Sequence, residues 1–370
     1  MQSKKKLAFL LVASVLCINI IATFGISKHQ GLPANIRDIL GVTHVAGTYN
    51  LGNTTGDFLN QGADMILALG SRTIKVWLHD PQSAYPFNSN WPASFSSLVT
   101  MAQHPYFDAL FRKPFSTYIL LVYSIGLPDA WWRSGSNQTL DDRERQQFHD
   151  LACYFLTNFT GTNKTFVFQN WESDWSIRGS YNASQPITQV EINGMIDWMN
   201  AHQAGVNQAR AEYGQHGVHV YNAAEVNVIA PAMNEGEACV INTVIPHMNV
   251  DLVSYSSWDT ERQGDEFQRA LDYIAAQTPD SPDFGAKNVY IGEYGAPEND
   301  LPASQLQATV ANVVSTGLAW GCPYIVYWEL FCNEPRHLPV TSNDDVRGYW
   351  LIRPDGTRSW TWQYLREYFA

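Results

Sequence analysis

Two glutamates in the chain each follow an apolar run that is typical of a buried strand. Residues 165–175 read TFVFQNWESDW and residues 288–297 read NVYIGEYGAP, which places Glu172 and Glu293 where a strand would leave a core. Burying an unpaired carboxylate costs several kcal/mol, roughly, so two such acids among Trp, Tyr and Asn indicate a functional site. Paired carboxyls of this kind carry out acid and nucleophilic chemistry on a glycosidic bond.

The elements that must position these acids follow a regular alternation. From Gly41 onward, short apolar runs rich in β-branched residues are followed by longer segments with helical periodicity. The predicted strands are 42–49, 73–78, 117–123, 165–169, 218–222, 250–255, 289–292 and 323–328. The predicted helices are 57–69, 98–111, 141–159, 190–213, 234–247, 264–277, 304–320 and 360–369. Strict alternation with nearly continuous apolar strands predicts an α/β fold with a parallel sheet, and eight repeats predict a single-domain (β/α)8 TIM barrel.

The barrel gives the two glutamates a geometric relation. Glu172 follows the fourth strand and Glu293 the seventh, and these strand ends face one another across the mouth of a closed barrel of eight. Hydrolysis with retention needs two carboxyls about 5 Å apart, one protonated and one ionised. The ionised partner raises the pKa of the acid, so each residue needs the other.

The residues at the strand ends resemble clan A of the retaining glycoside hydrolases. The matching pieces are Asn170 and Glu172 at strand four, Tyr255 with Trp258 at strand six, Glu293 within IGEYG at strand seven, Trp328 within YIVYWE at strand eight, and GYWLIRPDGT at 348–357 before the last helix. The resemblance covers nearly the whole chain after its first residues and implies the same barrel. It also implies that Glu172 is the acid/base and Glu293 the nucleophile.

One feature departs from that resemblance. The clan places Asn directly before the acid/base Glu, whereas Trp171 stands between Asn170 and Glu172 here. In a regular strand Asn170 and Glu172 would point the same way, which puts the usual contact from Asn to the sugar 2-hydroxyl in question. A bulge at Trp171 would restore that contact. The shift also leaves Asp174 as an alternative acid.

Aromatic and polar residues near the strand ends are candidates for binding substrate. The Pro- and aromatic-rich stretches 79–97 and 125–137 follow strands two and three, and such loops lie on the face of a barrel where active sites occur. The candidates are His79, Trp131, Trp132, Asn170, Trp171, Asp174, Trp175, Glu225, Tyr255, Trp258, Tyr294, Trp328 and Glu329. The structural alternative is that the tryptophans fill or cap the barrel and that Glu225 and Glu329 are hydrogen-bonded supports. If Lys75 on strand two points inward, it needs a carboxylate partner.

The first residues indicate export. Three lysines precede an apolar run from Leu7 to about Gly25, so we expect residues 1–28 to be a signal peptide or a type II signal anchor and residues 29–370 to be the catalytic domain. The protein would then be secreted or luminal. N-glycans are expected at the sequon asparagines Asn53, Asn137, Asn158, Asn163 and Asn182.

Cysteine usage and charge limit the partners. Four cysteines, Cys153, Cys239, Cys322 and Cys332, remain after the leader, and in an oxidising compartment they predict disulfide bonds with three possible pairings. No cluster of His and carboxylates has metal-ligand spacing, no spacing between cysteines resembles a zinc site, and no Gly-rich phosphate loop is found, so neither a metal nor a cofactor is expected. The net charge of −12, from 23 Lys and Arg against 35 Asp and Glu, argues against nucleic acid and is compatible with a carbohydrate partner.

Two other functions stay open from the sequence. The first is a catalytically inactive carbohydrate-binding barrel at the cell surface, which the displaced Asn170 keeps in consideration. The second is a transglycosylase that remodels extracellular glycan with the same two glutamates, passing the glycosyl group to a sugar hydroxyl and not to water.

Overall fold

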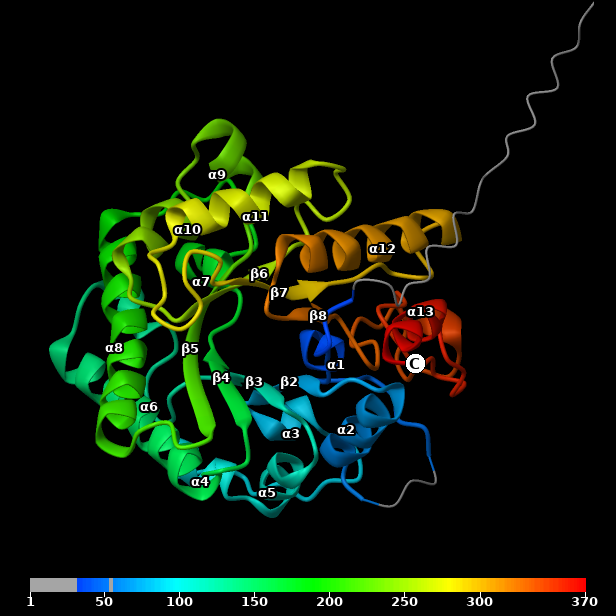
Figure 1. Cartoon of the computed structure of the whole chain (residues 1–370), viewed down its shortest axis with the longest axis horizontal. Coiled ribbons are helices and arrows are strands. Elements are labelled where there is room, and N and C mark those ends of the chain that lie inside the picture. The colour runs from blue at the N-terminus through cyan, green and yellow to red at the C-terminus, as the bar shows by residue number, and fades with distance from the viewer. Residues whose placement is uncertain (1–31, 53–55) are drawn as a thin grey trace, which may run out of the picture. The chain divides into compact units, whose positions relative to one another are not determined.

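The computed structural model describes residues 32–52 and 56–370, and Pro33–Ala370 form one compact unit (Figure 1). Eight parallel strands close into a barrel, because the last strand pairs with the first. The strands are β1 (Leu40–Thr43), β2 (Thr73–Leu78), β3 (Thr117–Val122), β4 (Lys164–Gln169), β5 (Val218–Val226), β6 (Leu252–Ser256), β7 (Val289–Tyr294) and β8 (Ile325–Tyr327). The predicted (β/α)8 barrel is confirmed.

Helices connect the strands. The α-helices are α1 (Ile36–Ile39), α2 (Phe58–Leu69), α3 (Pro81–Ala84), α4 (Leu98–Ala102), α5 (Pro105–Arg112), α6 (Gln138–Asn158), α7 (Ser173–Arg178), α8 (Gln189–Tyr213), α9 (Ala230–Glu235), α10 (Val240–Thr243), α11 (Glu266–Gln277), α12 (Ala303–Trp320) and α13 (Trp360–Phe369). Three short 3-10 helices are η1 (Trp131–Ser134), η2 (Ile245–His247) and η3 (Asn343–Asp345). The long helices α6 and α8 lie side by side on the outside of the barrel (Figure 1).

The strands agree with the predicted pattern of nearly continuous burial, and their ends differ by a few residues. The second strand has the predicted bounds, whereas the first begins at Leu40 and ends at Thr43. The fifth and seventh strands run further than predicted, because pairing continues through Val226 and Tyr294. Glu225 and Glu293 therefore lie within strands and not after them.

Two predicted helices are broken. The segment 98–111 forms α4 and α5, because Pro105 begins a new helix and His104 caps it. The prediction of one helix over 234–247 is wrong. That segment holds the end of α9, the short α10 and η2, because Gly236 adopts a left-handed conformation with φ 71° and Pro246 prevents continuation.

Two glycines allow β7 to approach its neighbours closely. A Cβ atom at Gly292 would lie 1.9 Å from Ser254 Oγ on β6, and one at Gly295 would lie 2.5 Å from the carbonyl oxygen of Trp328. The two glycines of IGEYG thus permit close packing of the backbone. They hold Glu293 at the inner wall of the barrel.

The predicted disulfide bonds are absent: all four cysteines of the described part of the chain are free. Cys153 is half-buried on α6, and the other three are buried on different elements. Cys239 accepts a contact from the guanidinium of Arg178, and the Cys332 thiol faces the carbonyl of Glu334. An even count of cysteines gave no information on whether their side chains meet.

The predictions of a leader at 1–28 and a glycan at Asn53 lie outside the described residues. The other sequon asparagines, Asn137, Asn158, Asn163 and Asn182, are all exposed. Over residues 32–52 and 56–370, none of the helices is both long and apolar enough to span a bilayer.

The contact at Gly292 predicts that Gly292→Ala lowers the free energy of unfolding by about 1–3 kcal/mol, because the added methyl overlaps Ser254 Oγ. Chemical denaturation measures the loss. The double variant with Ser254→Ala removes the overlapping atom and should recover part of it. If Gly292→Ala were as stable as the parent, the close approach of β6 and β7 would be refuted.

Candidate active site

The barrel brings Glu172 and Glu293 to its carboxyl-terminal mouth from opposite strands. Glu293 lies near the end of β7, opposite Ser256 of β6. Glu172 follows β4 and caps α7 with a left-handed backbone, φ 58°. Such a conformation is uncommon for a residue with a side chain and is typical of functional sites.

Three N–H donors hold the carboxylate of Glu293, which is 2% exposed. Its Oε1 accepts from Lys75 Nζ at 2.8 Å and from Trp171 Nε1 at 2.9 Å. Its Oε2 accepts from Trp258 Nε1 at 3.3 Å. Lys75 is fully buried on β2, so the sequence argument that an inward Lys75 needs a carboxylate partner is confirmed, and that partner is Glu293. The carboxylate is fixed in orientation, and its Oε2 is the less engaged oxygen.

Glu172 has the properties of a proton donor. Burial first, and then the charge of Glu293, raise the pKa of the Glu172 carboxyl to about 7. The Tyr181 hydroxyl is hydrogen-bonded to this carboxyl and moderates the shift. The other oxygen, Oε2, is buried without a partner among the described residues. A carboxyl with this pKa is protonated through the mildly acidic range and can donate its proton there.

Glu225 lies behind Glu172 and is fully buried on β5. It accepts hydrogen bonds from the Ser173 backbone N–H at 3.3 Å, the Ser256 hydroxyl at 2.5 Å and the Asn227 amide at 3.1 Å. Burial, followed by the charges of Glu293 and Glu172, raises its pKa well above the ordinary value. Through Ser173, Glu225 supports the turn on which Glu172 sits.

Asn170 does not point into the mouth. Its side-chain Oδ1 accepts from the Glu225 backbone N–H at 3.1 Å, and its side-chain Nδ2 donates to the Ser173 hydroxyl at 2.5 Å. The side chain is buried and both polar groups have protein partners, so the expected contact with a sugar hydroxyl does not fit this geometry. Trp171 instead faces the site, and its backbone exchanges two hydrogen bonds with the Tyr123 hydroxyl, at 2.8 and 3.0 Å.

Three other predicted site residues are directed away from the mouth. Asp174 is fully buried, pairs with Arg178, and accepts from the backbone of Val240. It is therefore a structural carboxylate and not a rival acid. Tyr255 is buried and bonds Asp259 at 2.6 Å. Tyr294 is buried and packs edge to face against Tyr327.

The wall beside Glu293 is aromatic. Trp328 lies nearly parallel to Trp171, with ring centroids 6.3 Å apart and planes inclined by 15°, and Trp77 contacts both rings. These three line a cavity of about 200 Å³ together with His79. Glu329 is buried behind this wall, where burial raises its pKa well above the ordinary value and its Oε1 accepts from the Asn333 backbone at 2.9 Å.

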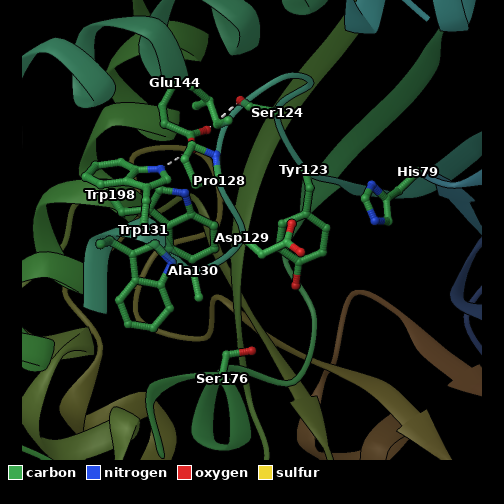
Figure 2. A pocket seen from close by; sticks show the side chains of 12 residues that line it. His79, Tyr123, Ser124, Pro128, Asp129, Ala130, Trp131, Glu144, Ser176 and Trp198 are labelled. Carbon is green, nitrogen blue, oxygen red and sulfur yellow. Dashed lines mark hydrogen bonds between the residues drawn. The ribbon is translucent and has the colours of Figure 1, made fainter. Parts of the chain in front are cut away.

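A larger cavity of about 320 Å³ adjoins the mouth and is lined by the segment after β3 (Figure 2). Trp131 lies against it and donates to Glu144 at 3.0 Å, while His79 and Tyr123 line the opposite side. Trp132 is buried and stacks on Trp198. Burial lowers the pKa of His79, which favours its neutral form.

A third cavity, of about 270 Å³, lies on the other flank between Trp175 and Trp258. The exposed Tyr181 packs near Trp175, with ring centroids 5.9 Å apart. Neither Tyr181 nor Tyr123 is among the site residues that the sequence predicts. Tyr181 lies in a polar loop that does not directly follow a strand, so no local pattern indicates it. Tyr123 is the last residue of a predicted strand, and this position at a strand end could have identified it.

No family model matches the chain, and neither does any curated protein. Solved structures do. A glycoside hydrolase 5 lichenase from Caldicellulosiruptor sp. F32, solved with cellotetraose, has a TM-score of 0.54 at 13% identity, covering 91% of this chain and 95% of its own. A GH5-4 broad-specificity endoglucanase from Bacteroides salanitronis has a TM-score of 0.52 at 11% identity, covering 90% and 92%.

A third similar structure is an exo-β-1,4-mannosidase from Opitutaceae bacterium strain TAV5, with a TM-score of 0.56 at 12% identity. The alignment covers 90% of this chain and 59% of the mannosidase. At these identities the likeness establishes the fold: the chain has the TIM barrel that these glycoside hydrolases also have.

The raised pKa of Glu172 predicts that Glu172→Gln stabilises the protein at pH 8 by about 1–3 kcal/mol, since each pKa unit corresponds to about 1.4 kcal/mol and the carboxyl is partly solvated. The folded state holds its proton to a higher pH than the unfolded state. Glu172 therefore destabilises the fold progressively as the pH rises from about 4.5 through 7, and the gain from Glu172→Gln should vanish at pH 4.

Denaturation at both pH values measures this difference, with Glu235→Gln, a change at an exposed glutamate, as the matched control. A Glu172→Gln variant whose stability relative to the parent is the same at pH 4 and pH 8 would show that this carboxyl is not perturbed.

Proposed function

We propose that the protein is an exported, retaining glycoside hydrolase that cleaves β-glycosidic bonds of an oligo- or polysaccharide. The observation that carries the proposal is the pair at the mouth: a buried Glu293 carboxylate fixed by three N–H donors, beside a Glu172 carboxyl whose pKa is about 7. Barrels host many chemistries, so the proposal rests on this pair and not on the fold.

The pair supports double displacement. Oε2 of Glu293 attacks the anomeric carbon, while Glu172 gives its proton to the leaving glycosidic oxygen. In the glycosyl-enzyme Glu293 is esterified and no longer charged. Because the charge of Glu293 is one cause of the raised pKa of Glu172, its loss lowers that pKa. Glu172 then accepts a proton from water, which displaces Glu293 and restores both groups.

The aromatic wall supports a saccharide substrate. The apolar faces of sugar rings stack on aromatic side chains, and Trp328, Trp171 and Trp77 offer such faces within contact of Glu293. The cavities along the flanks extend the mouth to either side, which favours a substrate of several sugar units. The similar structures named above include a lichenase with bound cellotetraose and an exo-β-1,4-mannosidase, and both names are consistent with β-linked glucan or mannan as a substrate class.

A carbohydrate-binding barrel without catalysis is the second candidate, and the placement of Asn170 favours it. The amide that would contact a sugar hydroxyl is bonded to Ser173 and Glu225. A transglycosylase would use the same residues as the hydrolase and differ in the acceptor. Product analysis at high acceptor concentration separates these two enzymes.

Replacement of the proposed nucleophile tests for catalysis. Glu293→Gln should lower kcat/KM on an activated aryl β-glycoside by several orders of magnitude, because the amide cannot form the glycosyl-enzyme. A 2-fluoro sugar should label Glu293 in the parent protein, as peptide mapping by mass spectrometry would reveal. Asp174→Asn is the matched control for loss of a buried carboxylate. A parent protein that binds saccharide without turning over any aryl glycoside would establish the binding function instead.

The pH dependence should follow the proton donor. The rate should decline as the pH rises through about 7, because Glu172 loses the proton that the leaving group needs, and should decline again in acid as the pair takes up a second proton. Measurement of kcat/KM against pH with a poor leaving group tests this. A rate that stays constant between about pH 5 and pH 9 would contradict the role of Glu172.

A further inference from the structure

A cluster of metal-ligating side chains lies between α6 and α8, away from the barrel mouth. His149 and Cys153 are one turn apart on α6 and therefore share one face of the helix. Glu212, near the end of α8, comes 63 positions after His149. The two helices lie side by side (Figure 1), and the three side chains come together between them.

The distances suit a single ion. His149 Nε2 lies 3.4 Å from Cys153 Sγ and 2.9 Å from Glu212 Oε2. One ligand atom from each residue lies within 4.8 Å of the others. Tetrahedral zinc with Zn–N near 2.0 Å and Zn–S near 2.3 Å separates those two atoms by about 3.5 Å, so shifts of a few tenths of an ångström would admit the ion.

Neighbouring side chains orient the three ligands. Asp150 Oδ1 lies 2.9 Å from His149 Nδ1, which directs Nε2 toward the cluster, as the carboxylate partner does at histidine-ligated metal sites. Gln208 donates to Glu212 Oε1 at 2.8 Å and leaves Oε2 for the cluster. Near the cluster, Gly205 allows α8 to approach α6 closely, because a Cβ at Gly205 would lie 2.3 Å from the carbonyl oxygen of Arg145.

We propose that α6 and α8 carry a zinc site formed by His149 Nε2, Cys153 Sγ and Glu212 Oε2, with water as the fourth ligand. Imidazole and thiolate select zinc over calcium and magnesium, which prefer oxygen ligands alone. Binding replaces the Cys153 S–H by a Zn–S bond and the proton on His149 Nε2, which faces the Glu212 carboxylate, by a Zn–N bond, and both protons pass to solvent. The ion ties together the two helices that also present Glu144 and Trp198 to the cavity beside the mouth.

Cobalt(II) reports the site directly. Full-length protein freed of metal with a chelator is titrated with CoCl2, and we expect one equivalent to give a thiolate charge-transfer band and the strong visible absorption of tetrahedral cobalt, both removed by one equivalent of ZnCl2. Cys153→Ser should abolish the charge-transfer band. His149→Ala and Glu212→Gln should weaken binding, and Asp150→Asn should weaken it about 10- to 100-fold.

Matched controls separate the site from general effects of substitution. His247→Ala and Glu235→Gln replace an exposed histidine and an exposed glutamate outside the cluster and should bind cobalt as the parent does. Circular dichroism verifies that each variant is folded. Absence of the charge-transfer band in the parent, or its survival in Cys153→Ser, would overturn the proposal and leave the cluster as an ion pair of His149 with its two carboxylates.

Two further readouts need no spectroscopic ion. Zinc at about one hundred times its Kd should reduce the unfolded population about a hundredfold and raise Tm in the parent but not in Cys153→Ser. Zinc should also slow alkylation of Cys153, the one thiol among the four described cysteines that is not fully buried, as peptide mapping would show. Unchanged Tm and alkylation in the presence of zinc would refute the site.

Discussion

The barrel mouth is organised around one buried ion pair, that of Glu293 with Lys75. Both side chains are withdrawn from water, and a buried charge without a partner would cost several kcal/mol, roughly. Lys75 also donates to the carbonyl oxygen of Gly292, and Trp171 and Trp258 supply the remaining donors to the carboxylate. Because the pair joins β2 to β7 across the barrel, the position of the carboxylate depends on closure of the whole sheet.

The electrostatics of the neighbouring acids follow from that pair. The charge of Glu293 contributes to the raised pKa of both Glu172 and Glu225, although burial is the larger cause in each. Glu225 is held by Ser173 and Ser256, and Ser173 in turn contacts Asn170. The hydrogen bonds to Glu225 thus also hold the left-handed turn at Glu172, because one of them comes from the backbone of the next residue, Ser173. Asn170 serves this network, and the indole of Trp171 occupies the side of the mouth that faces Glu293.

The sequence predicted the fold and the placement of Glu172 and Glu293 at strand ends because both depend on periodic or local signals. Alternating apolar runs and helical segments specify the barrel, and a carboxylate at the end of a buried strand is recognisable in a single run such as IGEYG. Departures from regular strand geometry were harder to predict. The direction of the Asn170 side chain depends on the Glu225 backbone of β5, which is distant in sequence, and the left-handed conformation of Glu172 at φ 58° has no signal in the local run. Asp174 is two positions from Glu172, yet its partner Arg178 makes it structural.

Side chains that meet only through helix packing were beyond a sequence argument. His149 and Cys153 have the spacing of a helical ligand pair, but that spacing is common, and Glu212 becomes their neighbour only when α8 docks on α6. The contrast between the two clusters is physical. At the mouth, burial raises the pKa of Glu172 and Glu225 above the usual range, an arrangement that lowers the stability of the fold at neutral pH. Between α6 and α8, Asp150 and Glu212 are exposed and each lies 2.9 Å from a ring nitrogen of His149, so hydrogen bonds at the surface hold that cluster together.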